Sequence, residues 1–122
     1  MSKKILVVED NDQNRLLMAD VLRPFGYEML EAKDGEEGVR MAREHKPDLI
    51  FMDLHMPVMD GLTATRLLKS DPETRHIKIV AVTSFAMKGD IEEAIEAGCA
   101  DYIAKPVNTR QLPEIVMKII GE

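Results

Sequence analysis

The sequence predicts a single α/β domain built on a doubly wound parallel sheet. Three short apolar runs, at residues 5–8, 49–52 and 77–82, have the length and continuity of strands buried on both faces. Segments with apolar residues at helical spacing lie between them, and this alternation is typical of right-handed βαβ units. A chain of 122 residues has the size of one domain with one core.

Breaker and capping residues divide the first half of the chain into two strand–helix pairs. Asn11 and Asp12 can cap the first helix, and a proline and a glycine soon after Arg23 end it. The second strand mixes apolar and charged residues, as an edge strand does, and Asp34-Gly35 then turns the chain into the second helix. These elements are expected at residues 5–8, 12–23, 27–32 and 35–45.

The second half predicts three more pairs. The run at 49–52 ends in Asp53, and Gly61 opens a helix after a short loop. Gly98 ends the next helix as its C-cap, and Pro113 is tolerated only in the first turn of the last helix. The elements after residue 52 are expected at 61–68, 77–82, 89–97 and 101–104, with the last helix beginning at 110–112.

Helical spacing identifies the side chains that should face the core. The last helix follows the i, i+3, i+4, i+7, i+8 pattern without a mismatch. Cys99, between a glycine and an alanine, should be a small buried apolar residue. The expected inward residues are Leu16, Leu17, Val21 and Leu22, then Val39 and Ala42, then Ile91, Ala94 and Ile95, and finally Leu112, Ile115, Val116, Ile119 and Ile120.

The burial of the strands predicts their order. The first, third and fourth runs are the most apolar, so they should be central, and the second and fifth strands should form the edges. The order 2-1-3-4-5 satisfies this condition and is one of the two common doubly wound orders. Its switch point lies between the first and third strands, and ligands bind there beside the carboxyl ends of the strands.

Composition and charge exclude several classes of protein. The 22 acidic residues exceed the 16 Lys and Arg, giving a net charge of −6, and only 4% of the residues are aromatic. A nucleic-acid partner is therefore not expected. No apolar run is long enough to cross a membrane, no signal peptide precedes the first strand, and a single cysteine fits a reducing compartment. We expect a cytoplasmic domain without membrane insertion.

Polar residues follow four of the strands and should meet at one edge of the sheet: Glu9, Asp10, Asp53, Thr83 and Lys105. Clustered carboxylates repel one another unless a cation lies between them. An all-oxygen site that also binds phosphate favours Mg²⁺, or Mn²⁺ in its place. The lysine and threonine can donate to a phosphoryl group, which an aspartate can accept as an acyl phosphate, mainly by positioning and charge neutralisation.

At these positions the sequence resembles the receiver domains of two-component response regulators, the CheY-like superfamily. The resemblance covers residues 1–122 and rests on motifs at the expected strand ends. Residues 85–90 look most like the DivK-type single-domain regulators and the receivers of hybrid histidine kinases. The motifs are the Glu9-Asp10 pair, Asp53 followed by Met56-Pro57 and Asp60-Gly61, Thr83, and Lys105-Pro106.

The resemblance implies a metal-assisted phosphoacceptor site. Asp53 would take the phosphoryl group. Asp10 would bind Mg²⁺ directly and Glu9 largely through water, with Asp53 and the backbone carbonyl of His55 completing the protein ligands. Lys105 would pair with the phosphoryl group, and its peptide bond to Pro106 would be cis, which proline makes accessible at about 0.5–1 kcal/mol.

The resemblance also implies how the site is read and tuned. Thr83 would hydrogen-bond a phosphoryl oxygen, and Tyr102 would be the aromatic residue that turns inward when Thr83 is drawn to the phosphate. The side chains of His55 and Phe85 would stand at the mouth of the pocket and tune the lifetime of the phosphoryl group.

The implied function is a phosphorylation-dependent switch rather than an enzyme, since the domain would catalyse only its own phosphorylation and dephosphorylation. The phosphoryl group would come from a sensor histidine kinase or a histidine phosphotransfer protein. A downstream protein would bind the fourth helix, fifth strand and fifth helix. The chain ends just after its last helix, so no output domain is expected. A stand-alone regulator and a receiver from a hybrid histidine kinase both remain open.

Two other classes fit less well. A Mg²⁺-dependent phosphatase with an aspartyl nucleophile usually has a second carboxylate two residues later, where this chain has His55, and the loops are too short to cap a substrate. A flavodoxin-like FMN protein shares the strand order. However, the loop Glu9-Asp10-Asn11-Asp12 would repel a phosphate unless a metal intervened.

Overall fold

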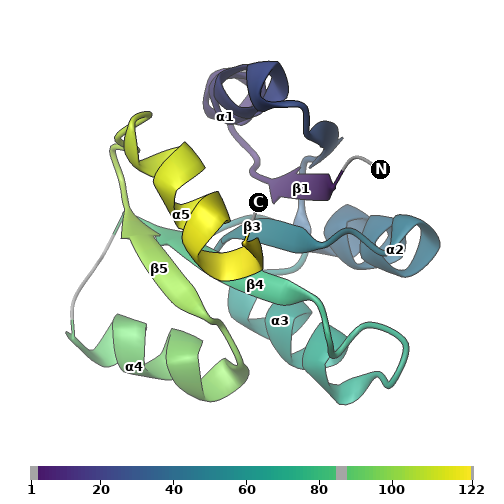
Figure 1. Ribbon diagram of the computed structural model, residues 1–122. Helices are drawn as coiled ribbons and strands as arrows, with labels where there is room; N and C mark the ends of the chain where they lie inside the picture. Colours follow the sequence, from purple (N-terminus) through teal and green to yellow (C-terminus); the bar gives the residue numbers. More distant parts are fainter. Residues whose placement is uncertain (1–2, 85–87, 122) are drawn as a thin grey trace.

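A five-stranded parallel sheet is the centre of the computed structural model, which describes residues 3–84 and 88–121 (Figure 1). The strand order is β2-β1-β3-β4-β5, as predicted, and a helix follows each strand. No predicted boundary is wrong by more than two residues. The strands are β1 (Lys4–Val8), β2 (Glu28–Ala32), β3 (Leu49–Asp53), β4 (Lys78–Thr83) and β5 (Asp101–Ala104), and the helices are α1 (Asp12–Leu22), α2 (Gly35–His45), α3 (Gly61–Ser70), α4 (Lys88–Ala97) and α5 (Gln111–Ile120).

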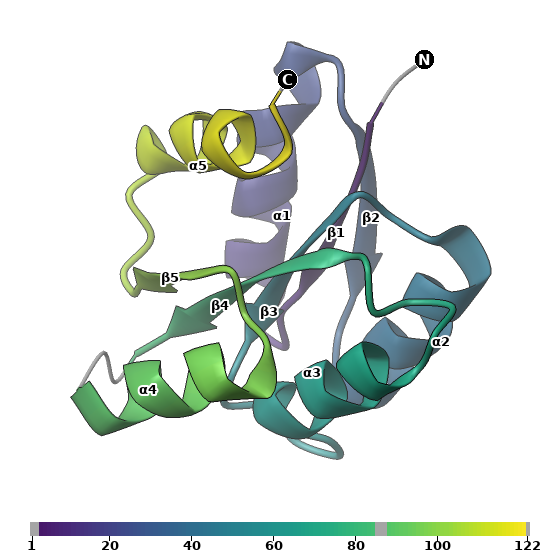
Figure 2. The same ribbon diagram turned by 60° about the horizontal axis from the view of Figure 1, so that its bottom comes forward.

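The helices form two layers, one on each face of the sheet. Helices α1 and α5 cover one face, and α2, α3 and α4 cover the other (Figure 2). The three central strands are buried on both faces, so alternate residues of each strand contribute to two separate cores. The largest fully buried side chains include Phe51, Ile5, Leu6, Leu49, Ile50 and Met52, all of them on β1 and β3.

The register of the sheet brings the ends of four strands together. Val8 pairs with Met52, so the residues that follow each strand's last apolar position, Glu9 and Asp53, stand side by side. On the far side, the final pair of β4 and β5 is Thr83 with Ala104. The chain after β5 therefore leaves the sheet next to the same edge.

Helix α1 is rotated relative to the sequence prediction. Met18 and Leu22 face the core, whereas Leu16 and Leu17 are 50% and 46% exposed. Apolar residues occur at helical spacing on two different faces of this helix, so periodicity alone does not show which face packs against the sheet. Arg15 lies on the inward face with Met18 and Leu22 and donates to a backbone carbonyl beneath the helix.

In α4 the prediction was wrong at one position. Ile95 is 49% exposed, whereas Ala94 is buried as predicted, and the small side chain of Ala97 faces inward with it. Small residues on this face allow a helix to lie close to its neighbours. The other inward assignments are confirmed: Val39, Ala42, Leu112, Ile115, Val116 and Cys99 are buried, and Val21, Ile91, Ile119 and Ile120 are partly buried.

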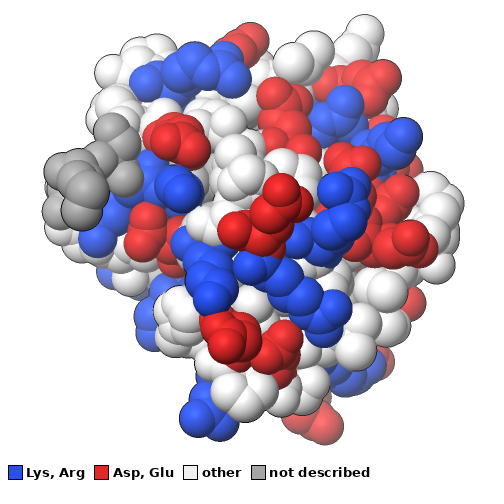
Figure 3. All heavy atoms as spheres, turned by 90° about the vertical axis from the view of Figure 1, so that its right-hand side faces the viewer, with Lys and Arg blue, Asp and Glu red and all other residues white. Residues whose placement is uncertain are grey.

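The outer surface of α2 mixes charges of both signs. Arg43 pairs with Asp71 at 3.2 Å and Lys46 with Glu73 at 2.7 Å, which ties α2 to the loop after α3. Figure 3 shows basic and acidic side chains intermixed on this side of the molecule. This face therefore lacks the single-sign field that nucleic-acid binding requires.

Among the described residues, no helix has the length and apolar character needed to span a membrane.

The first residue of α3 packs directly against the strand that ends in Asp53. The Gly61 amide donates to the Leu54 carbonyl at 3.2 Å, and Asp60 caps the helix by accepting from the Thr63 amide at 2.8 Å. A Cβ on Gly61 would overlap the backbone carbonyl of Asp53 and lie 2.8 Å from the Leu54 Cα. Glycine is therefore required here by close approach of two backbone segments.

We predict that Gly61→Ala lowers the free energy of unfolding by about 1–3 kcal/mol, the usual range for overpacking. The obstacle is backbone rather than a flexible side chain, so the strand end or the helix must shift. Urea unfolding followed by circular dichroism measures the change.

Gly89→Ala is the matched control, because a Cβ at Gly89 would meet no atom of the described residues within 4 Å. Alanine is also the better helix former, so this variant should unfold at the same or a higher urea concentration than the wild type. Equal stability of Gly61→Ala and the wild type would contradict the steric argument.

Candidate functional site

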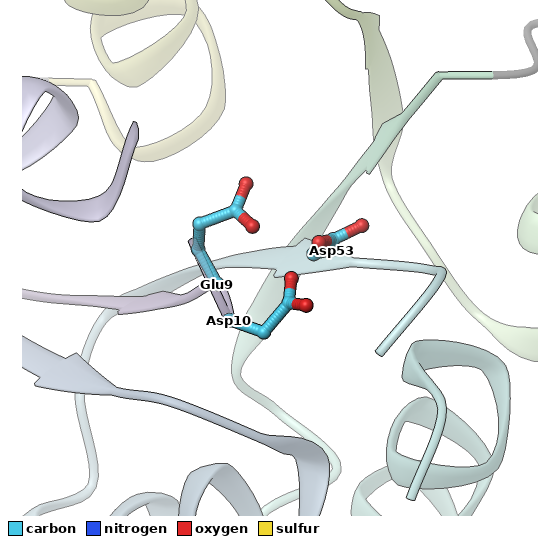
Figure 4. Close-up of side chains that lie close together, drawn as sticks. All are labelled: Glu9, Asp10 and Asp53. Carbon is cyan, nitrogen blue, oxygen red and sulfur yellow. The ribbon is translucent and has the colours of Figure 1, made fainter. Parts of the chain in front are cut away.

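Three carboxylates meet at the switch point of the sheet. Glu9 and Asp10 follow β1, Asp53 ends β3, and oxygen atoms of all three lie within 4.8 Å of one another. Figure 4 shows the three side chains gathered over the ends of these two strands. Glu9 and Asp53 are each 1% exposed, whereas Asp10 is open to solvent. The predicted cluster is therefore present in the structure.

The two oxygens of Asp53 are held by different parts of the chain. Oδ1 accepts a hydrogen bond from the His55 backbone amide at 3.1 Å. Oδ2 accepts one from Lys105 Nζ, also at 3.1 Å. These contacts fix the plane of the carboxylate at the edge of the sheet.

Lys105 lies between two buried carboxylates. Its Nζ is 2.8 Å from Glu9 Oε1 and 3.1 Å from Asp53 Oδ2. Burial lowers the pKa of the lysine, but the charges and hydrogen bonds of Glu9 and Asp53 outweigh burial, so the pKa is raised above its ordinary value. The ammonium is thus firmly charged at neutral pH.

Negative charge at the site remains under-compensated by the protein. Among the described residues, Lys105 is the cation paired with the carboxylates of the cluster, and it contacts two of the three. Glu9 Oε1 is buried, and apart from this ion-pair contact it has no hydrogen-bond partner in the described part of the chain. An all-oxygen group of this kind fits a hard divalent cation such as Mg²⁺. The residues present therefore fit the metal that the sequence predicted.

Thr83 lies at the same edge, and Tyr102 lies away from it. Thr83 is buried at the end of β4, and its carbonyl accepts a hydrogen bond from the Lys105 amide at 2.8 Å. Tyr102 on β5 is 38% exposed and lines a surface pocket of about 410 Å³ between β5 and α5. The structure therefore brings Thr83 to the cluster and leaves Tyr102 on the outer surface of the edge strand.

The remaining predicted positions surround the cluster. The side chain of His55 is exposed in the loop after β3, and its backbone amide reaches Asp53. The peptide bond between Lys105 and Pro106 is cis, the configuration that the resemblance implied. Phe85 lies outside the described residues.

The sequence prediction missed Arg15. This side chain, on the inward face of α1, donates through Nη1 to the Glu9 carbonyl at 2.8 Å, directly behind the acidic pair. The one signal in the sequence was the i, i+3 spacing of Asp12 and Arg15, and the two do form an ion pair at 2.6 Å. That spacing does not reveal a contact with the backbone of β1.

The strand order and the acidic cluster at the switch point together define a CheY-like α/β protein. The chain belongs to the response regulator receiver domain family, whose family model matches residues 5–117. The resemblance noted in the sequence is therefore confirmed.

Similar proteins match over almost the whole chain. The polar-differentiation response regulator DivK of Brucella anthropi is 43% identical over 122 residues, which cover 100% of this chain and 99% of that protein. The receiver domain of the sensor histidine kinase PA1611 from Pseudomonas aeruginosa PAO1 has a TM-score of 0.91 and 38% identity, with full coverage of both chains. That crystal structure has a magnesium ion coordinated in its active site cleft.

A third similar structure is a complex. It contains the Saccharomyces cerevisiae histidine phosphotransfer signaling protein Ypd1 and the receiver domain of its downstream response regulator Ssk1. The match has a TM-score of 0.91 and 30% identity and covers 97% of this chain and 88% of that chain.

We predict that Lys105→Met lowers the free energy of unfolding by about 2 kcal/mol in metal-free buffer, because it leaves two buried carboxylates without a cation. The loss should be smaller than for a fully buried pair, since the lysine side chain is 17% exposed. Urea unfolding near neutral pH measures it. The control Lys118→Met removes an exposed partner of Asp101, 3.3 Å away, and should leave stability unchanged.

The same pair of proteins tests the pKa of Lys105. Because the pKa of Lys105 is higher in the folded than in the unfolded protein, its charge adds to the free energy of unfolding. This contribution is complete at pH values below the ordinary lysine pKa of 10.5, and it is lost as the pH rises through the pKa of the folded protein. The difference between wild type and Lys105→Met should therefore be constant from neutral pH upward and shrink only in that alkaline range. A difference that disappears below the ordinary value would contradict the assignment.

Proposed function

We propose that this chain is a phosphorylation-dependent switch of a two-component signalling system, with Asp53 as its phosphoacceptor. The single observation that carries the proposal is the position of Asp53. It lies at the carboxyl end of a central strand, with Lys105 on one oxygen, the His55 amide on the other and two further carboxylates beside it. The family match supports this function, because receiver domains are the receiving modules of such systems.

The transfer uses few protein groups. A carboxylate oxygen of Asp53 forms a bond to phosphorus as the bond between phosphorus and the donor's imidazole nitrogen breaks, and the electron pair leaves with the imidazole. The donor is a phosphohistidine of a sensor histidine kinase or a histidine phosphotransfer protein. Lys105 exchanges its carboxylate contacts for a phosphoryl oxygen, and Thr83 donates to another.

Mg²⁺, or Mn²⁺ as a substitute, would be held directly by Asp10, Asp53 and the carbonyl of His55, and by Glu9 through water. When bound, the ion would neutralise the charge that the phosphoryl oxygens share with these carboxylates. The under-compensated charge of the cluster supports this assignment, as does the magnesium ion in the cleft of the PA1611 receiver domain.

The output runs through the surface of α4, β5 and α5, where a downstream protein binds. Tyr102 supports this proposal because it is half-exposed on β5, on the strand that leads directly to Lys105. Drawing Thr83 toward the phosphoryl group clears space into which the tyrosine turns. The side chains of His55 and Phe85 set the lifetime of the phosphoryl group by controlling water access.

The protein has no substrate other than its donor and catalyses only its own phosphorylation and dephosphorylation, in the cytoplasm. The same chemistry serves a stand-alone regulator, as the match to DivK suggests, and a receiver within a longer kinase, as the match to PA1611 suggests. An aspartyl phosphatase is disfavoured, because the residue two positions after Asp53 is histidine rather than a carboxylate.

We predict that acetyl phosphate and Mg²⁺ produce one labile phosphoryl adduct, because the small donor replaces the phosphohistidine while the protein supplies the rest of the site. Intact-mass spectrometry and a phosphate-affinity gel detect the adduct. It should be absent in Asp53→Asn and in the presence of EDTA. Asp48→Asn, at an exposed aspartate just before β3, is the matched control and should be phosphorylated normally.

No adduct in the wild type would overturn the proposed function. Steady multi-turnover release of phosphate at enzyme-like rates would favour the phosphatase instead.

We predict that Thr83→Ala still accepts the phosphoryl group but changes conformation less when it does so. The Thr83 hydroxyl donates a hydrogen bond to the phosphoryl group and is not the nucleophile. Backbone amide shifts of β5 and α5 on addition of beryllofluoride, a phosphoryl mimic, should fall to less than about half of the wild-type changes. A full response in Thr83→Ala would remove Thr83 from the switch while leaving the role of Asp53 intact.

A further inference from the structure

Arg15 joins three segments of the chain behind the acidic cluster. Its Nη1 donates to the Glu9 carbonyl at 2.8 Å, its Nη2 to Asp12 Oδ1 at 2.6 Å and its Nε to Glu31 Oε1 at 3.3 Å. These acceptors belong to the turn after β1, the first turn of α1 and the edge strand β2. The Arg15 side chain is 15% exposed, so its contacts with Glu9 and Glu31 are partly buried, whereas the contact with the exposed Asp12 is open to water.

We propose that Arg15 is a positioning residue for the metal site: by holding the peptide between Glu9 and Asp10, it aims the Asp10 carboxylate at Asp53 and so sets the affinity for a divalent cation. The inference rests on the proposed function, since it assumes that these carboxylates bind the cation.

The contact acts through a planar peptide. The Glu9 carbonyl and the Cα of Asp10 belong to the same rigid peptide unit, so holding the oxygen restricts the direction in which Asp10 leaves the strand. Asp10 needs this restraint. Its side chain is exposed, and its carboxylate has no hydrogen bond or ion pair among the side chains and backbone groups that the structure describes.

Glu9, in contrast, is held by its own contacts. Its Oε2 accepts from the Asn11 amide at 3.1 Å, and its Oε1 faces Lys105. The consequence of losing Arg15 should therefore fall mainly on Asp10, the ligand expected to bind the ion directly.

The guanidinium is itself well anchored. Burial lowers the pKa of Arg15, but the hydrogen bonds and charges of Asp12 and Glu31 outweigh burial and raise it, so the group stays charged. A guanidinium presents its N–H groups in a rigid planar fork, which allows it to serve acceptors in three directions at once. A lysine at this position could reach one of them but not all three.

Charge and positioning predict opposite effects on metal binding. Arg15 is a cation close to a site for a cation, so by charge alone its removal should strengthen Mg²⁺ binding. If positioning dominates, removal weakens binding, because Asp10 must be ordered when the ion binds. The sign of the change therefore separates the two roles.

The test compares Arg15→Ala, Arg15→Lys and Arg23→Ala in the full chain. The control Arg23 forms an i, i+3 ion pair with Asp20 at 2.6 Å, as Arg15 does with Asp12, but it is 52% exposed and lies just beyond the C-terminus of α1. Titration with MgCl₂, followed by the backbone amide of His55 in ¹H–¹⁵N NMR spectra, gives the dissociation constant.

We expect the dissociation constant for Mg²⁺ to rise roughly tenfold in Arg15→Ala, the lower end of the effect of losing a group that orients metal ligands. Arg15→Lys should show roughly a threefold rise, because it keeps the charge but loses the fork. Arg23→Ala should bind as the wild type does. With acetyl phosphate, the half-saturating Mg²⁺ concentration should rise in parallel, while the rate at saturating Mg²⁺ stays within about twofold.

Unchanged or tighter Mg²⁺ binding in folded Arg15→Ala would overturn the inference, even if its melting temperature fell, since that pattern describes a purely structural residue. If Arg15→Ala is too unstable to titrate, Arg15→Lys decides alone: weaker binding supports the inference and unchanged binding overturns it. A wild-type protein that binds no Mg²⁺ overturns the proposed metal site itself, which is a different result.

Discussion

The structure depends on how negative charge is balanced at the edge of the sheet. Two carboxylates, on Glu9 and Asp53, are almost fully buried, and Lys105 bridges them. An unpaired buried charge costs several kcal/mol, so the lysine has to reach both groups at once. It can do so only if β5 lies beside β4, β4 beside β3 and β3 beside β1, which is the observed order. The electrostatics of the site and the topology of the sheet therefore impose the same arrangement.

Backbone contacts then bring the neighbouring elements close to these charges. Gly61 allows α3 to begin directly against the Asp53 carbonyl at the end of β3. Arg15 holds the turn after β1 from the opposite layer of helices. The carboxylates thus lie between two rigid supports, one on each face of the sheet, and the remaining freedom of the site lies toward solvent and toward β5.

The parts of this arrangement that the sequence predicted are those that depend on strand burial. Continuous apolar runs located the central strands, and the residues after them gave Glu9, Asp10 and Asp53 without reference to any side-chain contact. The rotation of α1 could not be predicted in this way, because its apolar residues fit two helical phases and a polar contact from Arg15 accompanies the one observed. Ile95 was misassigned for a similar reason, since hydrophobicity alone favours isoleucine over Ala97, which actually faces inward beside Ala94. The clearance at Gly61 depends on the distance between two backbones, which no spacing of residues reveals.

The β1 side and the β5 side of the site are held by different contacts. This difference bears on which strand would transmit the effect of phosphorylation. On the side of β1, Arg15 contacts the turn after the strand through acceptors that a phosphoryl group on Asp53 would not replace. On the side of β5, Lys105 contacts Asp53 and Glu9 through an ammonium whose partners a phosphoryl group could replace, and its backbone amide donates to the Thr83 carbonyl. In the proposed function, a new charge on Asp53 would therefore displace groups attached to β4 and β5 more readily than groups attached to β1. The rearrangement proposed for this site should accordingly pass to the edge strand that carries Tyr102, and leave the turn after β1 in place for the reverse reaction.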